Sequence, residues 1–146
     1  MTKPLLVHGT AIAIDGDAVL LRGQPGAGKS DLALRLIDGG ARLVADDQAE
    51  LQRSGRHIRV RAPASIAGLL EVRGIGIVRV HALAQARLVL LVDLVPAVEV
   101  ERLPDRNFEE LLGLAIPRVV LTPFEASAPA KVRLAVDEFR LSWLPP

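Results

Sequence analysis

The chain has 146 residues, of which 50% are hydrophobic, 3% are aromatic and none is cysteine, and its formal net charge at pH 7 is +1. This length and apolar content fit one compact domain with a buried core, which we expect to span residues 1–146. The composition excludes a disulfide framework and a thiolate metal site, and it argues against a strongly charged or aromatic surface for nucleic acid.

Two apolar segments are candidates for membrane targeting, and neither has the required pattern. Residues 1–17 contain too short an apolar stretch for a signal peptide and no small-residue cleavage pattern after it. The most apolar run, residues 88–98, is interrupted by Asp93 and Pro96 and is too short to span a bilayer. We therefore expect a cytoplasmic protein that binds neither membranes nor nucleic acid.

The first half of the sequence predicts short strands that lead into a glycine-rich loop and a helix. Apolar runs between turn signals such as Asp15-Gly16-Asp17 predict the strands. Leucines four residues apart predict a helix over 29–38, which Gly39-Gly40 would end as a left-handed C-terminal cap. The predicted strands are 5–7, 10–14, 18–22 and 42–45, followed by a hairpin of 49–53 and 57–61 that turns at Ser54-Gly55.

The second half predicts further strands and less regular helices. The apolar runs predict strands over 74–80, 87–95, 118–122 and 131–136. A short helix is possible within 63–70, a weak helical pattern covers 106–114, and 137–143 reads as a terminal helix or coil. Together the elements predict an α/β fold with a mixed sheet and few helices.

The glycine-rich loop carries the strongest chemical signal in the chain. Gly23, Gly28, Lys29 and Ser30 satisfy G-x-x-x-x-G-K-[ST], with an apolar strand before the loop and an amphipathic helix after it. Glycines allow backbone N–H groups to surround a phosphate, and the helix N-terminus adds partial positive charge. We therefore expect the phosphates of a nucleotide to bind the loop, with Lys29 on the β- and γ-phosphates and Ser30 on Mg²⁺. The expected binding residues are Gly23, Gln24, Pro25, Gly26, Ala27, Gly28, Lys29 and Ser30.

A phosphoryl-transfer site of this type needs a carboxylate at the end of an apolar strand, and two places in the sequence qualify. Asp93 follows the apolar run 88–92, whereas Asp46 and Asp47 follow 43–45. The short spacing after Lys29 favours the pair, because one helix and one turn return the chain to the loop's side of the sheet. Neighbouring strand residues face opposite ways, so one acid would face the metal and the other an acceptor hydroxyl. For Asp93 an ion pair or a charge at a strand edge is the favoured interpretation, although a place in the metal shell stays open.

The order of these motifs resembles the catalytic domain of HPr kinase/phosphorylase. The match runs from about residue 5 to residue 80, and the segments that carry it are "LLVHGTAIAIDGDAVLLRGQPGAGKSDLALRLIDGGARLVADD" at 5–47 and "GLLEVRGIGIVRV" at 68–80. The resemblance implies a P-loop kinase domain related to phosphoenolpyruvate carboxykinase. It also implies a serine protein kinase that uses Mg²⁺ and ATP on an HPr-type phosphocarrier protein, that also runs the phosphorolytic reverse reaction, and that assembles as a homo-oligomer, a hexamer in the family.

The resemblance also implies roles for individual residues. Asp47 matches the acceptor of the seryl proton, with Asp46 in the same network, and His8 matches a histidine near the reacting phosphate. Gly74 and Gly76 belong to a segment that the family uses in both directions of the reaction. The positions implied to be catalytic are His8, Lys29, Asp46, Asp47, Arg73 and Arg102, and those implied to bind Mg²⁺ are Ser30 and Glu71.

The sequence also departs from the family pattern. Pro104 weakens the match around Arg102, and "APAKVRLAV" at 128–136 stands where the family has a stretch containing Gly-Arg-Asn, although Lys131 and Arg133 could supply positive charge there. This change argues against the reverse reaction. The short chain predicts a compact single-domain variant.

Two other functions stay open from the sequence. The same domain could bind ATP without catalysis and pass that state to a partner of a two-component or phosphotransferase system. A small-molecule or nucleotide kinase is the third possibility, but no arginine-rich lid segment is recognisable in the sequence.

Overall fold

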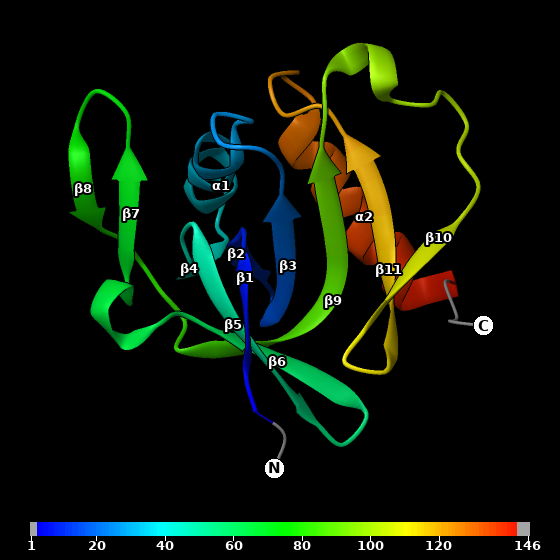
Figure 1. The fold of residues 1–146 in the computed structure, drawn as a ribbon. Helices are drawn as coiled ribbons and strands as arrows, with labels where there is room; N and C mark the ends of the chain where they lie inside the picture. The colour runs from blue at the N-terminus through cyan, green and yellow to red at the C-terminus, as the bar shows by residue number, and fades with distance from the viewer. Residues whose placement is uncertain (1–2, 143–146) are drawn as a thin grey trace.

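The computed structural model describes residues 3–142, and Figure 1 shows their arrangement. Short 3₁₀ helices at Ala64–Ile66 and Ala97–Glu99 interrupt the order of strands. The main elements are β1 (Leu5–His8), β2 (Thr10–Ile14), β3 (Asp17–Arg22), α1 (Lys29–Asp38), β4 (Arg42–Ala45), β5 (Gln48–Ser54), β6 (His57–Arg61), β7 (Leu69–Val72), β8 (Gly76–Arg79), β9 (Gln85–Leu94), β10 (Asn107–Leu111), β11 (Leu114–Leu121) and α2 (Ala128–Ser142).

Nine of the strands in this part of the chain form one mixed sheet, and β7 pairs with β8 in a separate hairpin. The main order is β1-β5-β6-β9-β3-β2-β4, and β11 joins β9 beside β6 and carries β10. β3, β9 and β11 run parallel, and β2 lies antiparallel between β3 and β4. The expectation of a mixed α/β fold with few helices is confirmed.

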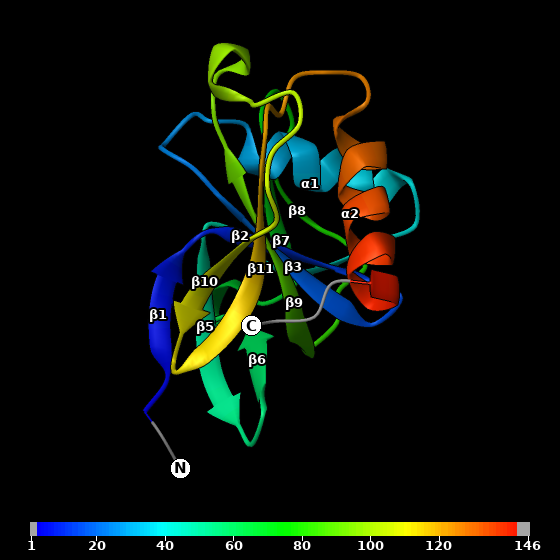
Figure 2. The same cartoon turned by 90° about the vertical axis from the view of Figure 1, so that its right-hand side faces the viewer.

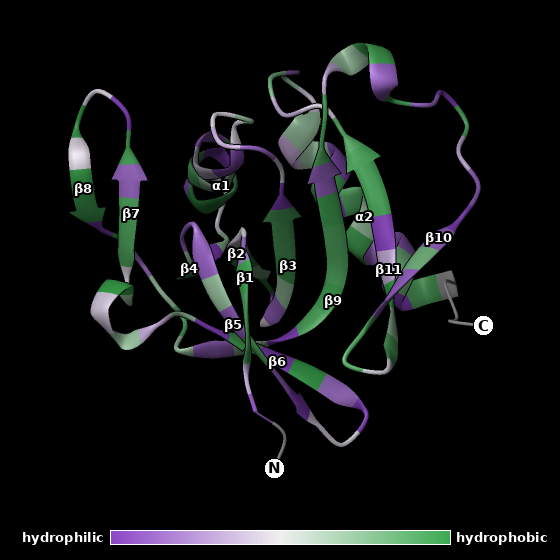
Figure 3. Cartoon of the chain, in the orientation of Figure 1, coloured by the Kyte–Doolittle hydropathy of each residue, from purple (hydrophilic) through white to green (hydrophobic). Residues whose placement is uncertain are grey.

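The sheet is buried on both faces because it curls over itself on one side and is covered by helices on the other. One apolar cluster joins β3 and β9 to α1 and α2, and a second joins the opposite faces of the same strands to β5 and β6. Figure 2 shows the helices on one side of the sheet and β1 and β5 on the other. Burial on both faces explains why the central strands read as continuous apolar runs, and Figure 3 shows the middle of β3 and most of β9 as hydrophobic.

The topology brings four connections to one edge of the sheet. β4 runs in the same direction as β3, since both are antiparallel to β2, and β9 and β11 share that direction. The carboxyl ends of these four strands therefore meet at one edge, where ligands bind in open α/β sheets. The glycine-rich loop after β3 and the aspartates after β4 lie on the same side, as the spacing predicted.

Helix α1 has the predicted bounds and ends as predicted. Gly40 has a φ of +110°, its N–H donates to the carbonyl oxygen of Ile37, and the N–H of Ala41 donates to that of Leu36. These two bonds form a Schellman motif, which requires a left-handed residue after the helix. Arg133 of α2 also donates to the carbonyl oxygen of Leu36 at 3.1 Å and so ties the two helices together.

Two predicted elements are wrong. Residues 131–136 were expected as a strand and belong to α2, because Ala128, Val132 and Val136 are spaced four apart and are all fully buried. Residues 106–114 were expected to be helical and form β10 and its turn into β11. The predicted short helix within 63–70 is a single 3₁₀ turn, and Trp143 of the predicted terminal element lies outside the described residues. Within residues 3–142 no helix has the length and apolar character needed to cross a membrane.

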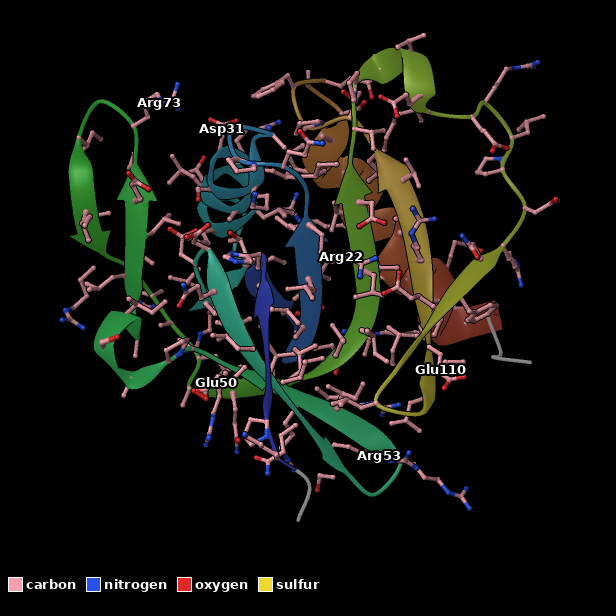
Figure 4. All side chains as sticks on the ribbon, in the orientation of Figure 1. Arg22, Asp31, Glu50, Arg53, Arg73 and Glu110 are labelled. Carbon is pink, nitrogen blue, oxygen red and sulfur yellow. The ribbon has the colours of Figure 1, made fainter. Side chains whose placement is uncertain are left out.

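Asp93, the alternative carboxylate, lies in an ion-pair cluster at the start of the glycine-rich loop. Its oxygens accept hydrogen bonds from Arg22 at 2.8 and 3.1 Å and from Arg118 at 2.5 Å. Arg22 also donates to both carboxylate oxygens of Glu109, at 2.6 and 2.8 Å. Figure 4 labels Arg22 between β3 and β9. The ion-pair interpretation of Asp93 is therefore confirmed.

The cluster shifts the protonation of two of its members. The hydrogen bond from Arg22 is the main reason that the pKa of Glu109 lies below its ordinary value of 4.5. The hydrogen bond to Glu109 likewise raises the pKa of Arg22, with Asp93 adding to this effect and burial opposing it. A carboxyl whose pKa is lowered by folding stabilises the fold above its ordinary pKa and loses that contribution as the pH falls below it.

We expect Glu109→Gln to remove part of the acid sensitivity of folding. The midpoint of urea unfolding should fall more steeply for the unmodified chain than for this variant as the pH is lowered from about 4.5, because only the unmodified chain has the Arg22–Glu109 pair to lose by protonation. Glu110→Gln is the matched control, since Glu110 is exposed on the same strand. Equal acid slopes for Glu109→Gln and the unmodified chain would contradict the assigned cause.

Candidate functional site

The glycine-rich loop between β3 and α1 has a backbone that only glycine adopts readily. Gly26 and Gly28 have φ values of +80° and +97°, in the left-handed region. A Cβ on Gly23 would lie 3.2 Å from the carbonyl oxygen of Leu94, so the loop also approaches β9 closely. Lys29 Nζ donates to the carbonyl oxygens of Gly23 at 2.8 Å and of Gln24 at 3.2 Å. The loop is therefore closed around its lysine.

Asp46 connects the loop to three other parts of the fold. It follows β4 and is only 7% exposed. Its Oδ1 accepts hydrogen bonds from Ser30 Oγ at 2.7 Å and Thr10 Oγ1 at 3.0 Å. Its Oδ2 accepts one from the backbone N–H of Glu71 at 3.0 Å. A carboxylate can be buried this deeply because these three donors replace the water molecules that would solvate it when exposed.

Asp47 is placed by the same network but faces the other way. Its N–H donates to Thr10 Oγ1 at 3.1 Å, and its carbonyl oxygen accepts from Gly9 N at 2.9 Å. Its φ of +67° is left-handed, a conformation that Asp tolerates better than most residues. Asp46 and Asp47 diverge as expected, but the reason is this turn and not the alternation of a strand, since Asp47 lies beyond β4.

A cavity of about 820 Å³ joins these parts, a volume typical of small-molecule sites. The β4–β5 turn contributes Asp47, and the segment after β11 contributes Phe124. The loop and α1 contribute Pro25, Gly26, Gly28, Lys29, Ser30, Asp31 and Leu34, and the β7–β8 hairpin contributes residues 71–77. The cavity thus combines a glycine-rich loop, of the kind that binds phosphate, with the exposed carboxylate of Asp47.

The β7–β8 hairpin brings the second group of predicted residues to the cavity. Glu71, Arg73, Gly74 and Gly76 all line it. Gly74 and Gly76 have φ values of +91° and +114°, which the tight turn between the strands requires. Figure 4 shows Arg73 at the end of β7, next to the turn, near the top of the hairpin. Glu71 is joined to the rest of the site through its N–H bond to Asp46.

Other predicted residues lie elsewhere. His8 is exposed at the end of β1 and pairs with Gln48, the residue after Asp47, but is not among the residues that line the cavity. Arg102 is exposed in the connection between β9 and β10, away from the hairpin. Of the two cations at 128–136, Lys131 pairs with Glu125 at 2.7 Å and Arg133 binds the end of α1. The structure does not bring these residues into the cavity.

The oxygen atoms beside the loop fit a magnesium ion. The Ser30 hydroxyl donates a hydrogen bond to Asp46, so the lone pairs of Ser30 Oγ remain available to a metal ion. Glu71 adds an exposed carboxylate. Mg²⁺ prefers such oxygen donors and keeps waters and phosphate oxygens as its other ligands. Residues 3–142 hold no group of three or more His, Cys, Asp or Glu residues suited to binding a metal. The protein would therefore supply only part of the coordination, as is usual for Mg²⁺ bound with a nucleotide.

Sequence reasoning missed three residues that shape the site. Thr10 is fully buried and joins Asp46 to Asp47, and its signal was a hydroxyl at the start of an otherwise apolar strand. Phe124 covers Gly28 and lines the cavity. Arg35 holds the segment that carries Phe124, through bonds to the carbonyl oxygens of its two neighbours. No motif marked the last two, since both depend on contacts between α1 and a segment about 90 residues away.

Comparison with known proteins agrees with this geometry. The family model of the HPr serine kinase C-terminal domain matches residues 1–140. An HPr kinase/phosphorylase of Bordetella pertussis is 40% identical over 127 residues, and one of Leptothrix cholodnii is 42% identical over 127 residues. These matches cover 79% and 78% of this chain, but only 41% and 39% of the relatives.

A solved structure shares the fold over almost its whole length. The HPr(Ser) kinase/phosphatase from Coxiella burnetii superposes with a TM-score of 0.82 and 28% sequence identity, covering 94% of this chain and 91% of that one. The chain spans about two fifths of the length of the curated relatives that it matches. On the family model, the curated relatives and the shared fold, the chain belongs to the family of the HPr serine kinase C-terminal domain.

Proposed function

We propose that this chain carries the catalytic site of a serine protein kinase that transfers the γ-phosphoryl group of ATP to a seryl residue of an HPr-type phosphocarrier protein. The observation that carries the proposal is that Asp47 and the glycine-rich loop line one cavity and are joined through Thr10, Asp46 and Ser30. The names of the relatives, HPr kinase/phosphorylase, support the same activity.

The fold supports a P-loop kinase of the phosphoenolpyruvate carboxykinase-like type. A strand, a glycine-rich loop and a helix occur in sequence as in all P-loop proteins. The antiparallel β2 between β3 and β4 distinguishes this sheet from a doubly wound parallel one. The antiparallel insertion and the curled sheet favour the carboxykinase-like type.

In this proposal the loop of residues 23–30 binds the phosphates of ATP, and Lys29 neutralises charge on the β- and γ-phosphates. Ser30 and Glu71 would hold Mg²⁺, with Asp46 orienting the Ser30 hydroxyl. The metal ion, when bound, neutralises negative charge on the phosphates. Positioning and electrostatic stabilisation of this kind supply most of the catalysis in phosphoryl transfer.

Asp47 acts on the acceptor. The seryl oxygen forms a bond to the γ-phosphorus, the bond from that phosphorus to the bridging oxygen of ADP breaks, and the seryl proton passes to the Asp47 carboxylate. The exposed position of Asp47 at the cavity suits a base that must meet a side chain of another protein. Arg73 at the hairpin turn lines the cavity and would add charge stabilisation when the acceptor protein is bound.

We expect Asp47→Asn to lower kcat for phosphoryl transfer by roughly 100-fold or more, because a general base contributes on the order of 10²–10⁴. Asn also tolerates the left-handed backbone, so the fold should be retained. The assay is transfer of γ-³²P from ATP to purified phosphocarrier protein.

Asp15→Asn is the matched control for Asp47→Asn. Asp15 also has a positive φ, 49°, and lies at the opposite end of β3 from the loop. Its variant should transfer phosphate at the unmodified rate. Equal rates for Asp47→Asn and the unmodified chain would remove Asp47 from the proposed role. Tight ATP binding without transfer to any phosphocarrier would instead favour a nucleotide sensor.

We expect Ser30→Ala to raise the Mg²⁺ concentration needed for half-maximal transfer by roughly tenfold, because it removes a metal ligand held by Asp46. Ser30→Thr keeps the hydroxyl that the loop motif allows and should restore the original dependence. Titration of activity with Mg²⁺ at saturating ATP measures the shift. An unchanged Mg²⁺ dependence in Ser30→Ala would place the ion elsewhere.

A further inference from the structure

Phe124 is an exposed aromatic residue in direct contact with the phosphate loop. The residue is 69% exposed and lines the 820 Å³ cavity. A Cβ built on Gly28 would lie 2.9 Å from Phe124 Cζ and 3.0 Å from the ring of Pro123. Gly28 therefore allows the ring to approach the loop backbone, and the rest of the ring remains open to the cavity.

The segment that carries Phe124 is fixed to the helix that begins at the loop. Arg35 of α1 donates to the carbonyl oxygens of Pro123 and Glu125, the residues on either side. Its guanidinium also pairs with Asp31 in the first turn of α1. The Glu125 carboxylate is bound by Lys131 of α2 at 2.7 Å. The exposed ring thus belongs to a segment that these bonds already hold in place. Little conformational entropy would therefore be lost when the ring binds a ligand.

The topology places Phe124 and Asp47 at opposite ends of the cavity. Asp47 follows β4 and Phe124 follows β11, and β2, β3 and β9 lie between those two strands. The phosphate loop follows the middle strand of these, β3. In Figure 1, α1 stands between the β7–β8 hairpin and the segment that enters α2. A triphosphate with its γ-phosphoryl group toward Asp47 therefore extends its other end toward Phe124.

We propose that Phe124 binds the nucleobase of the nucleotide, which stacks on the exposed part of its ring. This inference rests on the proposed binding of ATP to the loop. Stacking on an aromatic side chain tolerates any base, because every base has a π-face. Ile75 and Ile77, the other large hydrophobic residues that are exposed in the cavity lining, belong to the hairpin that carries Glu71, which lies on the other side of α1 from the segment that enters α2 (Figure 1).

The test compares a ligand that has a base with one that has none. Equilibrium dissociation constants for ATP and for inorganic tripolyphosphate, both with Mg²⁺, are measured by calorimetry. Phe124→Ala should raise the dissociation constant for ATP by roughly 5- to 100-fold, the effect of losing one stacked base, and should leave that for tripolyphosphate within about twofold. Phe124→Trp should retain ATP binding, and Lys29→Ala should weaken both ligands.

Two further variants separate stacking from packing. Phe124→Leu keeps apolar bulk over Gly28 and removes the aromatic face, so it should weaken ATP alone, and it decides the matter if the alanine variant fails to fold. Leu134→Ala is the control, since Leu134 is 63% exposed on α2 and does not line the cavity. Its dissociation constants for both ligands should match those of the unmodified chain.

Failure of the inference differs from failure of the proposed function. Equal weakening of ATP and tripolyphosphate in Phe124→Leu, or no change in either, would overturn the base-binding role even if phosphoryl transfer is observed. A selective loss of ATP affinity together with no transfer by the unmodified chain would uphold the base-binding role and reject the kinase. An unmodified chain that binds neither ligand would overturn both.

Discussion

The site depends on one buried carboxylate and its three hydrogen-bond donors. Asp46 accepts bonds from the hydroxyl groups of Ser30 and Thr10 and from the N–H of Glu71. These donors belong to α1, β2 and β7. The Asp46 side chain therefore fixes the glycine-rich loop, the sheet and the β7–β8 hairpin relative to one another. Removing a single donor would leave a buried anion short of partners, which is costly in a low-dielectric interior.

The same network places two adjacent acids in different environments. Asp46 is buried and its oxygens are occupied by protein donors, whereas Asp47 turns into the cavity on a left-handed backbone. Thr10 connects them, because its hydroxyl donates to Asp46 and accepts from the Asp47 N–H. Identical carboxylates thus acquire different environments, one suited to organising the loop and the other to meeting a second protein.

The sequence was sufficient to predict the loop, α1, its cap and most strands, since those depend on local spacing. It misled at residues 131–136, where Val132, Leu134 and Val136 alternate as in a strand, although Leu134 is exposed and the two valines share one helix face. It also missed contacts between distant segments, such as that of Thr10 with Asp46. His8 and Arg102 were assigned to the site by resemblance alone. Neither lines the cavity, and spacing along the chain does not determine which distant segments come together there.

The ion-pair cluster before the loop affects the electrostatic field of the cavity. Arg22 and Arg118 are matched by Asp93 and Glu109, so the four charges sum to zero one residue before Gly23. A neutral cluster neither attracts nor repels a polyanion over long range. Under the proposed function, the attraction for a triphosphate at this edge would come from groups of the cavity itself, Lys29 and Arg73 among them. The ion pairs can consequently hold the strand before the loop in place without attracting anions in general to the site.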